Sequence, residues 1–160
     1  MPQLQMAPRV TMIAGIDTDG KVYLSLLQAN TNNQVMEIFM RQLCRKLDKE
    51  RANWREHYLC VLDNAPYHTS DATIRLLERL RVPVCFTGPH SYDACPAELL
   101  FATFKSRDIN PRHVPTGKGH FLEVTRLVVA RLQEVPLHQR ILYWHHCLKE
   151  LYRYLFFQRL

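Results

Sequence analysis

The sequence predicts an α/β fold in which helices flank a mixed sheet, and three patterns carry this prediction. A β-hairpin leads the chain, short apolar runs typical of buried strands follow it, and amphipathic segments typical of helices separate those runs. Strands that alternate with helices in this way pair in parallel through right-handed crossovers. The length of 160 residues fits one domain with a substantial core.

The leading hairpin is indicated by two apolar, β-branched runs with a turn between them. The runs cover residues 10–16 and 21–27, and the turn has the sequence Asp-Thr-Asp-Gly at residues 17–20. Glycine supplies the positive φ that such a turn requires. Asp17 and Asp19 are therefore interpreted as turn residues.

The next helices and strands follow from apolar spacing and from capping residues. A helix is predicted over residues 33–52, where apolar side chains recur at helical spacing after an Asn-rich segment. Residues 58–62 and 83–86 are short continuous apolar runs, which favour strands buried on both faces. Residues 69–71 (Thr-Ser-Asp) cap a helix between these two strands. The core residues predicted for the first helix include Met36, Phe39 and Met40.

The C-terminal part of the chain is predicted to form a loop and two helices. The loop covers residues 106–119, and the helices cover residues 120–134 and 137–158. Apolar residues of the second helix follow gaps that alternate between four and three: Leu137, Ile141, Trp144, Leu148, Leu151 and Leu155. Such a seam is typical of a packed helical hairpin or of a partner-binding helix, and we expect the fold to use it internally.

Composition and charge restrict the functional class. The five cysteines include no C-x-x-C pair, which argues for a reducing compartment and against a disulfide framework or a zinc ribbon. No apolar run approaches the length of a membrane span, so no membrane partner is expected. Residues 1–98 contain eleven Lys or Arg and eleven Asp or Glu, whereas residues 99–160 contain ten and four. This basic region favours a polyanionic substrate, and a solvated basic helix face is the equal alternative.

Two acids, Asp63 and Glu98, form the candidate site. Asp63 ends an apolar run, and Glu98 opens a helix-like stretch after a turn-rich loop, with thirty-four residues between the two acids. An acid at a strand end and an acid in the first turn of a helix can converge on one point. Carboxylate oxygens from distant parts of a chain are typical ligands of hard divalent cations. We therefore predict that Asp63 and Glu98 meet at a shared metal site.

The sequence around both acids resembles the motifs of mariner-type transposases and of their bacterial insertion-sequence relatives. Residues 63–68, Asp-Asn-Ala-Pro-Tyr-His, resemble the second-acid motif of that family. Residues 88–98 resemble its third-acid motif, which usually reads Pro-Pro-Tyr-Ser-Pro-Asp-Leu-Asn-Pro-Ile-Glu. The positions that match are Pro89, Ser91, Asp93, Pro96 and Glu98. The spacing of the acids and the Phe-Ala-Thr-Phe-Lys continuation are also similar, so the resemblance extends from about residue 10 to residue 106.

The resemblance implies an RNase H-like fold and a two-metal nuclease and strand-transferase site that uses Mg²⁺ or Mn²⁺. Residues 1–106 would form a partial RNase H-like DDE catalytic domain, and residues 107–160 would add the basic loop and the C-terminal helices of the same domain. Asp63 would bridge both ions and Glu98 would hold one, as hydrolysis and transfer of DNA phosphodiesters require. Transposon ends and target DNA would be the partners, and we expect a nuclear location.

Three further residues are candidates for supporting roles, each with a structural alternative. Asn64 would orient Asp63 or contact a phosphate, or would form an Asx-type turn. His68 would lie near the scissile phosphate, or would cap or pack a helix. Lys105 would contact a DNA phosphate, or would be a solvated lysine. Cys95 stands where the family has Asn, and a thiol is a weaker hydrogen-bond partner.

The resemblance lacks one acid. The family's first Asp lies on a strand before a segment like residues 10–27, and we expect this chain to lack that strand. Asp17 is rejected as a substitute, because it lies at the opposite end of its strand, roughly 20 Å away at about 3.3 Å per residue. An edge left open in this way predicts marginal stability or self-association.

Three explanations of the missing acid stay open, and each implies a different function. The chain is a fragment or decayed copy of a transposase, or a repurposed module that binds DNA or protein without catalysis, or one half of an assembly. In the last case a second copy or a partner polypeptide supplies the strand. Another RNase H-like nuclease, such as a resolvase or a ribonuclease, is a further alternative.

Overall fold

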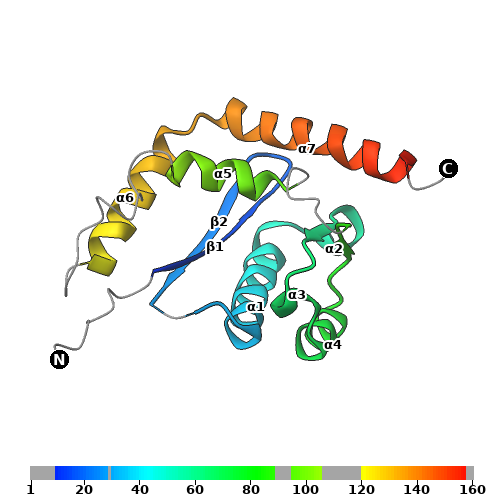
Figure 1. Cartoon of the computed structure of the whole chain (residues 1–160). Helices are drawn as coiled ribbons and strands as arrows, with labels where there is room; N and C mark the ends of the chain where they lie inside the picture. Colours follow the sequence, from blue (N-terminus) through cyan, green and yellow to red (C-terminus); the bar gives the residue numbers. More distant parts are fainter. Residues whose placement is uncertain (1–9, 29, 89–94, 106–119, 158–160) are drawn as a thin grey trace, which may run out of the picture. The chain divides into compact units, whose positions relative to one another are not determined.

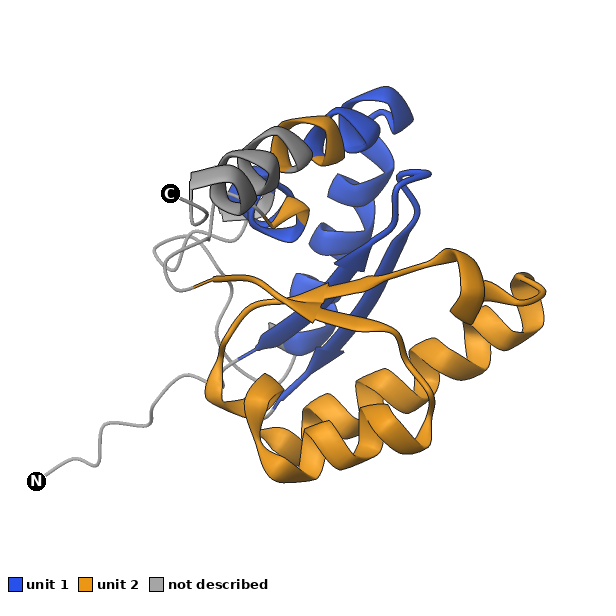
Figure 2. Cartoon of the chain, turned by 90° about the vertical axis from the view of Figure 1, so that its right-hand side faces the viewer, with its two compact units in different colours: residues 1–30, 97–143 blue, residues 31–96, 144–160 orange. Residues whose placement is uncertain are grey.

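The computed structural model describes residues 10–28, 30–88, 95–105 and 120–157, without the side chains of residues 104, 105, 120 and 148–157. The chain divides into two compact units, which Figure 2 distinguishes by colour. Unit 1 comprises residues 1–30 and 97–143, and unit 2 comprises residues 31–96 and 144–160. The predicted loop at residues 106–119 and the family-like positions 89–94 lie outside the described residues.

Unit 1 contains the predicted hairpin (Figure 1). Strands β1 (Thr11–Ile16) and β2 (Val22–Leu27) pair antiparallel, with Thr11 opposite Leu27 and Ile16 opposite Val22. Oδ1 of Asp17 accepts hydrogen bonds from the backbone N–H groups of Asp19 (3.0 Å) and Lys21 (2.9 Å). The Tyr23 hydroxyl donates to Oδ2 of Asp17 at 3.1 Å. Both oxygens of the Asp17 carboxylate therefore stabilise the hairpin, which confirms Asp17 as a turn residue.

Helices cover one face of this hairpin. The core of unit 1 consists of Leu100, on helix α5 (Pro96–Lys105), together with Val124 and Val128, on helix α6 (His120–Glu134). Alternate residues of the hairpin pack against this core: Val10, Met12, Ala14, Val22, Leu24 and Leu26. The alternation follows from the two-residue period of side chains along a strand. The apolar residues of each strand thus project to one face, where the helices bury them.

The start of helix α7 (Leu137–Phe157) packs against the hairpin turn. Gly20 has a φ of 77°, and a Cβ at this position would lie 2.9 Å from Cδ1 of Leu137 and 3.2 Å from Cγ1 of Ile141. Glycine adopts this backbone conformation without strain, whereas a Cβ would strain the backbone and require the exposed Leu137 side chain to move. Leu137 and Ile141, the first two residues of the predicted seam, lie beside Gly20, while Leu137 stays 53% exposed. The side chains at the end of the seam, from Leu148 onward, lie outside the described residues.

Unit 2 combines a parallel strand pair with a helical core. The elements are α1 (Asn33–Glu50), α2 (Trp54–His57), β3 (Cys60–Leu62), α3 (Pro66–Thr69), α4 (Asp71–Arg79) and β4 (Val84–Phe86). Strands β3 and β4 pair in parallel, with Cys60 opposite Val84 and Leu62 opposite Phe86. Helix α1 packs against α3 and α4. The buried residues of this unit include Met36, Phe39, Met40, Cys44, Trp54, Leu76 and Leu77, which confirms the predicted core of the first helix.

Helix starts in unit 2 follow the predicted capping chemistry. The Asn32 side chain caps α1 by accepting from the N–H of Val35 at 2.9 Å. The Ser70 hydroxyl caps α4 by accepting from the N–H of Thr73 at 3.3 Å. Side-chain oxygens at these positions satisfy backbone donors that have no partner inside the helix.

The described strands form two two-stranded sheets, the antiparallel pair in unit 1 and the parallel pair in unit 2. The four-residue helices α2 and α3 were not predicted, because one helical turn is too short for apolar periodicity to appear.

None of the five cysteines forms a disulfide. Among the described helices, none combines the length and apolarity needed to cross a membrane.

Candidate metal-binding site

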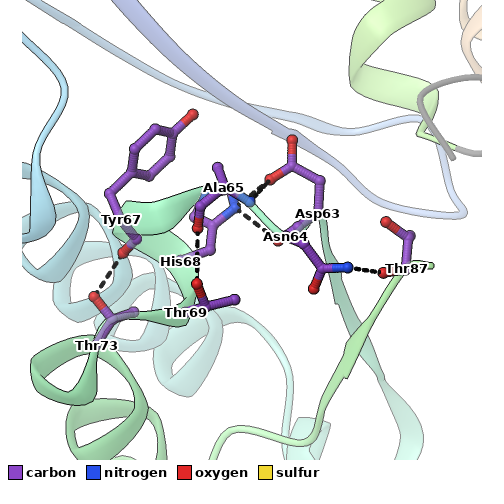
Figure 3. A network of polar contacts seen from close by, with 8 residues as sticks. All are labelled: Asp63, Asn64, Ala65, Tyr67, His68, Thr69, Thr73 and Thr87. Atoms are coloured by element: carbon purple, nitrogen blue, oxygen red, sulfur yellow. Dashed lines mark hydrogen bonds and ion pairs between the residues drawn. The ribbon is translucent and has the colours of Figure 1, made fainter. Parts of the chain in front are cut away.

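Asp63 follows β3 directly, and its carboxylate is oriented by two donors from the next five residues (Figure 3). The N–H of Ala65 donates to Oδ1 at 3.0 Å, which closes an Asx-type turn. Nδ1 of His68 lies 2.6 Å from the same oxygen. The Asp63 side chain is 36% exposed. One side of the carboxylate is thus fixed to the protein while the group stays accessible.

His68 is held firmly beside Asp63. It lies on α3, its side chain is only 14% exposed, and its ring packs edge-on against the Tyr67 ring with centroids 4.6 Å apart. Nδ1 also lies 3.2 Å from the backbone carbonyl oxygen of Asp63. A carboxylate and a carbonyl are both acceptors, so Nδ1 carries the proton in this contact. Of the two alternatives for His68, a packed histidine describes its surroundings, with the added contact to Asp63.

Asn64 joins the ends of the two parallel strands. Its Nδ2 donates to the backbone carbonyl of Thr87, the residue after β4, at 2.5 Å. The N–H of Thr87 donates to the carbonyl of Leu62 at 2.8 Å. Of the alternatives for Asn64, the Asx-type turn is formed by Asp63 instead. Asn64 fixes the segment that carries Asp63 to β4, through a hydrogen bond to Thr87 that the sequence did not predict.

Helix α3 is anchored to α4 behind the site. The Thr73 hydroxyl donates to the carbonyl of Tyr67 at 2.8 Å, and Thr73 is fully buried. Leu76 and Leu77, one turn further along α4, belong to the buried core. The position of His68 is consequently coupled to the core of unit 2 through α3 and α4.

Glu98 lies in the first turn of α5, as predicted. The helix begins at Pro96, a residue suited to the first helical position, and Glu98 is exposed. Leu100, two residues further, is fully buried in the core of unit 1. A carboxylate near a helix N-terminus is favoured by the helix dipole. Lys105 is the last residue of α5, and its side chain lies outside the described part.

The two candidate acids belong to different units, Asp63 to unit 2 and Glu98 to unit 1. Their convergence at one cation stays a prediction. Within residues 10–28, 30–88, 95–105 and 120–157, no group of three or more His, Cys, Asp or Glu side chains is arranged to hold a metal ion. Oδ2 of Asp63 has no hydrogen-bond donor in the described part of the chain, and Figure 3 shows it directed away from Ala65 and His68. An oxygen of this kind fits the preference of Mg²⁺ or Mn²⁺ for hard ligands.

The arrangement of the elements matches solved structures of one transposase. The catalytic domain of Mos1 mariner transposase is 20% identical, with 91% of this chain and 72% of that chain covered and a TM-score of 0.75. The same catalytic domain with raltegravir and Mg gives 20% identity, coverage of 89% and 71%, and a TM-score of 0.74. A pre-cleavage Mos1 transpososome gives 18% identity, coverage of 96% and 45%, and a TM-score of 0.77. In a comparison with curated proteins, no sequence matches the chain.

These likenesses define the class of the fold, which is the RNase H-like α/β fold of the Mos1 catalytic domain. The sequence model of the DDE superfamily endonucleases matches residues 2–118, which is most of the chain. The chain therefore belongs to the DDE superfamily endonuclease family. The resemblance found from the motifs around Asp63 and Glu98 is thereby confirmed.

Proposed function

We propose that this chain is the metal-dependent nuclease and strand-transfer part of a transposase. The family and the fold support this function, and the observation that carries it is the Asp63 carboxylate. One of its oxygens is fixed by Ala65 and His68, while the other is directed away from both. A carboxylate oriented in this way is prepared to bind a cation without rearrangement, which lowers the cost of binding.

Asp63 and Glu98 would supply hard oxygen ligands to Mg²⁺ or Mn²⁺. A pair of such ions neutralises charge on the attacking and leaving oxygens of a phosphodiester in an in-line displacement. Water or a DNA 3′-hydroxyl would be the nucleophile, so no side chain of this protein needs to form a covalent bond to DNA. The support from relatives is that Mos1 catalytic-domain structures are described with Mg and with Mn.

DNA is the partner that this function requires, and we expect it to act in the nucleus. Mos1 paired-end complexes are described with a transposon end, which supports DNA as the class of substrate. The chain spans about 45% of the Mos1 chain in the pre-cleavage transpososome. The excess of Lys and Arg in residues 99–160 suits a polyanion. Binding that weakens steeply with salt is the expected signature.

Nicking of labelled DNA with Mn²⁺ tests the proposal. Asp63→Asn and Glu98→Gln are expected to abolish nicking. The matched controls are Asp71→Asn and Glu123→Gln, because each of these acids lies in the first turn of a helix in the same unit as its counterpart. Both controls are expected to nick as the wild type does. Equal nicking by all four variants would refute the assignment.

A binding module without catalysis is the second candidate. The observation in its favour is the excess of Lys and Arg in residues 99–160, which suits a polyanion with or without catalysis. The same assay separates the two functions. Salt-sensitive DNA binding without nicking, unchanged in Asp63→Asn, would identify the module. A parallel incubation with an RNA–DNA hybrid distinguishes a ribonuclease.

A further inference from the structure

The two oxygens of the Asp63 carboxylate have different environments. Oδ1 accepts from Ala65 at 3.0 Å and from His68 at 2.6 Å, and both contacts lie within unit 2. Oδ2 has no donor among the described residues and is directed away from both partners (Figure 3). A carboxyl group can rotate about its bond to Cβ, and this torsion is broad when nothing restricts it. Two donors on one oxygen restrict it to a single orientation.

The contribution of His68 differs from that of Ala65. The Ala65 N–H belongs to the turn and would be present with almost any residue at position 65, whereas the His68 donor depends on its side chain. That side chain is 14% exposed and packs against Tyr67, on a helix that the buried Thr73 hydroxyl ties to α4. His68 thus presents its Nδ1–H from a support with little freedom to move.

We propose that His68 is a positioning residue for Asp63, which fixes Oδ1 so that Oδ2 is presented to a divalent cation. The inference rests on the proposed function in naming a cation as the occupant. Hydrogen bonds that orient a metal ligand commonly change metal affinity by about 10–100-fold when they are removed. The contact between His68 and Asp63 is itself independent of the metal, so it can be tested separately.

Substitutions at position 68 separate the donor from the packing. His68→Asn retains a donor, because the Asn amide nitrogen is as many bonds from Cα as Nδ1 of His. His68→Gln places its amide nitrogen one bond further away, and His68→Phe keeps a flat ring without a donor. Mn²⁺ affinity, measured by water-proton relaxation on the full chain, is the first readout. We expect His68→Phe to weaken Mn²⁺ binding about 10–100-fold, His68→Gln to weaken it less than His68→Phe, and His68→Asn to remain within a few-fold of wild type.

The protonation of the ring gives a second readout that requires no metal. In the metal-free wild type, ¹⁵N NMR is expected to show the neutral His68 ring protonated at Nδ1. A ring protonated at Nε2 instead would overturn the inference, because the contact with Asp63 requires the Nδ1–H. This measurement uses the wild type alone, so it tests the inference even if a substitution disturbs folding. If His68→Phe fails to fold, the comparison of His68→Asn with His68→Gln replaces it.

The pattern across variants distinguishes failure of this inference from failure of the proposed function. If Asp63→Asn abolishes Mn²⁺ binding while His68→Phe binds as the wild type does, His68 does not position Asp63 and the proposed function stands. If the wild type shows no Mn²⁺ binding that depends on Asp63, the proposed function fails and the inference fails with it. Weakened binding in His68→Phe that His68→Asn restores supports both.

Discussion

The two units present their candidate acids by different physical means. In unit 2, Asp63 is oriented by polar atoms of residues within five positions along the chain, Ala65 and His68. In unit 1, Glu98 is exposed, and its position is set by apolar packing of its helix, because Leu100 on the same helix is buried against the hairpin. The orientation of Asp63 therefore depends on local hydrogen bonds, whereas the position of Glu98 depends on contacts between segments far apart in the sequence.

The chain offers separate probes for this difference. Both tryptophans, Trp54 and Trp144, and all five cysteines fall within the residues assigned to unit 2. Tryptophan fluorescence and cysteine alkylation therefore report on unit 2, whereas far-UV circular dichroism reports on helices of both units. Variants in either unit can be followed by comparing the two kinds of signal.

The largest effect is expected from Leu100→Ala in unit 1. Leu100 is fully buried, so the truncation leaves a cavity and should lower the free energy of unfolding by about 2–5 kcal/mol. Urea unfolding followed by circular dichroism measures this loss, and Leu122→Ala is the control because Leu122 is 56% exposed on α6. We expect the tryptophan fluorescence transition to shift less than the circular dichroism transition. Equal shifts of the fluorescence and circular dichroism transitions would contradict this expectation, because the two units would then unfold together.

A smaller loss is expected from Gly20→Ala in the hairpin turn. The substitution combines a positive φ with a Cβ 2.9 Å from Leu137, so we expect a loss of about 1–3 kcal/mol. Gly15→Ala is the matched control, because the nearest atom to its Cβ would be Cβ of Tyr23, at 4.0 Å. Thermal melts of the two variants test this pair. A loss in Gly15→Ala as large as that in Gly20→Ala would contradict the assignment of strain to the turn.

Ser70→Ala should reduce stability by about 1 kcal/mol through loss of the α4 cap. Ser70→Asp retains a side-chain oxygen and should unfold close to wild type. Because α4 supports α3, tryptophan fluorescence during urea unfolding is the measurement that reports this change. An unchanged unfolding midpoint in Ser70→Ala would show that the cap contributes no measurable stability to unit 2.

The smallest effect is expected in chemical modification: Cys60 should react very little with iodoacetamide in the folded protein. Desolvation raises the pKa of the half-buried Cys60 thiol to about 12, above the value of about 8.5 typical of an unfolded chain. The thiolate is the reactive form, so Cys60 should stay unmodified at pH 8, and its reactivity should appear on unfolding or as the pH rises toward 12. Cys85, which is exposed, is the internal control, and mass spectrometry of peptides measures both. Early modification of Cys60 would indicate that β3 opens in the folded state.

Features encoded by neighbouring residues were predicted well. The Asp-Thr-Asp-Gly turn and the cap at residues 69–71 each depend on chemistry within about four residues, and the structure confirms both. Asp63 and Glu98 were also placed correctly at the end of a strand and in the first turn of a helix.

Features that depend on strand register or on a single helical turn were missed. The hydrogen bond from Asn64 to Thr87 exists because β3 and β4 pair with Leu62 opposite Phe86, and the sequence does not reveal that register. The contact of His68 with Asp63 requires the one-turn helix α3 to bring the chain back toward β3. The Asn-Ala-Pro sequence after Asp63 indicated a turn, but it did not indicate that this turn would bring the His68 side chain back to Asp63.

The asymmetry of the Asp63 carboxylate determines how informative a substitution at that position can be. In Asp63→Asn, the amide carbonyl can still accept from Ala65 and His68, while the NH₂ group takes the outward position. The turn is thereby preserved, and a cation meets a donor that repels it. Asp63→Ala would remove the acceptor as well and would release His68. Loss of activity in the amide variant can thus be assigned to the missing ligand, whereas the same loss in the alanine variant would confound chemistry with local unfolding.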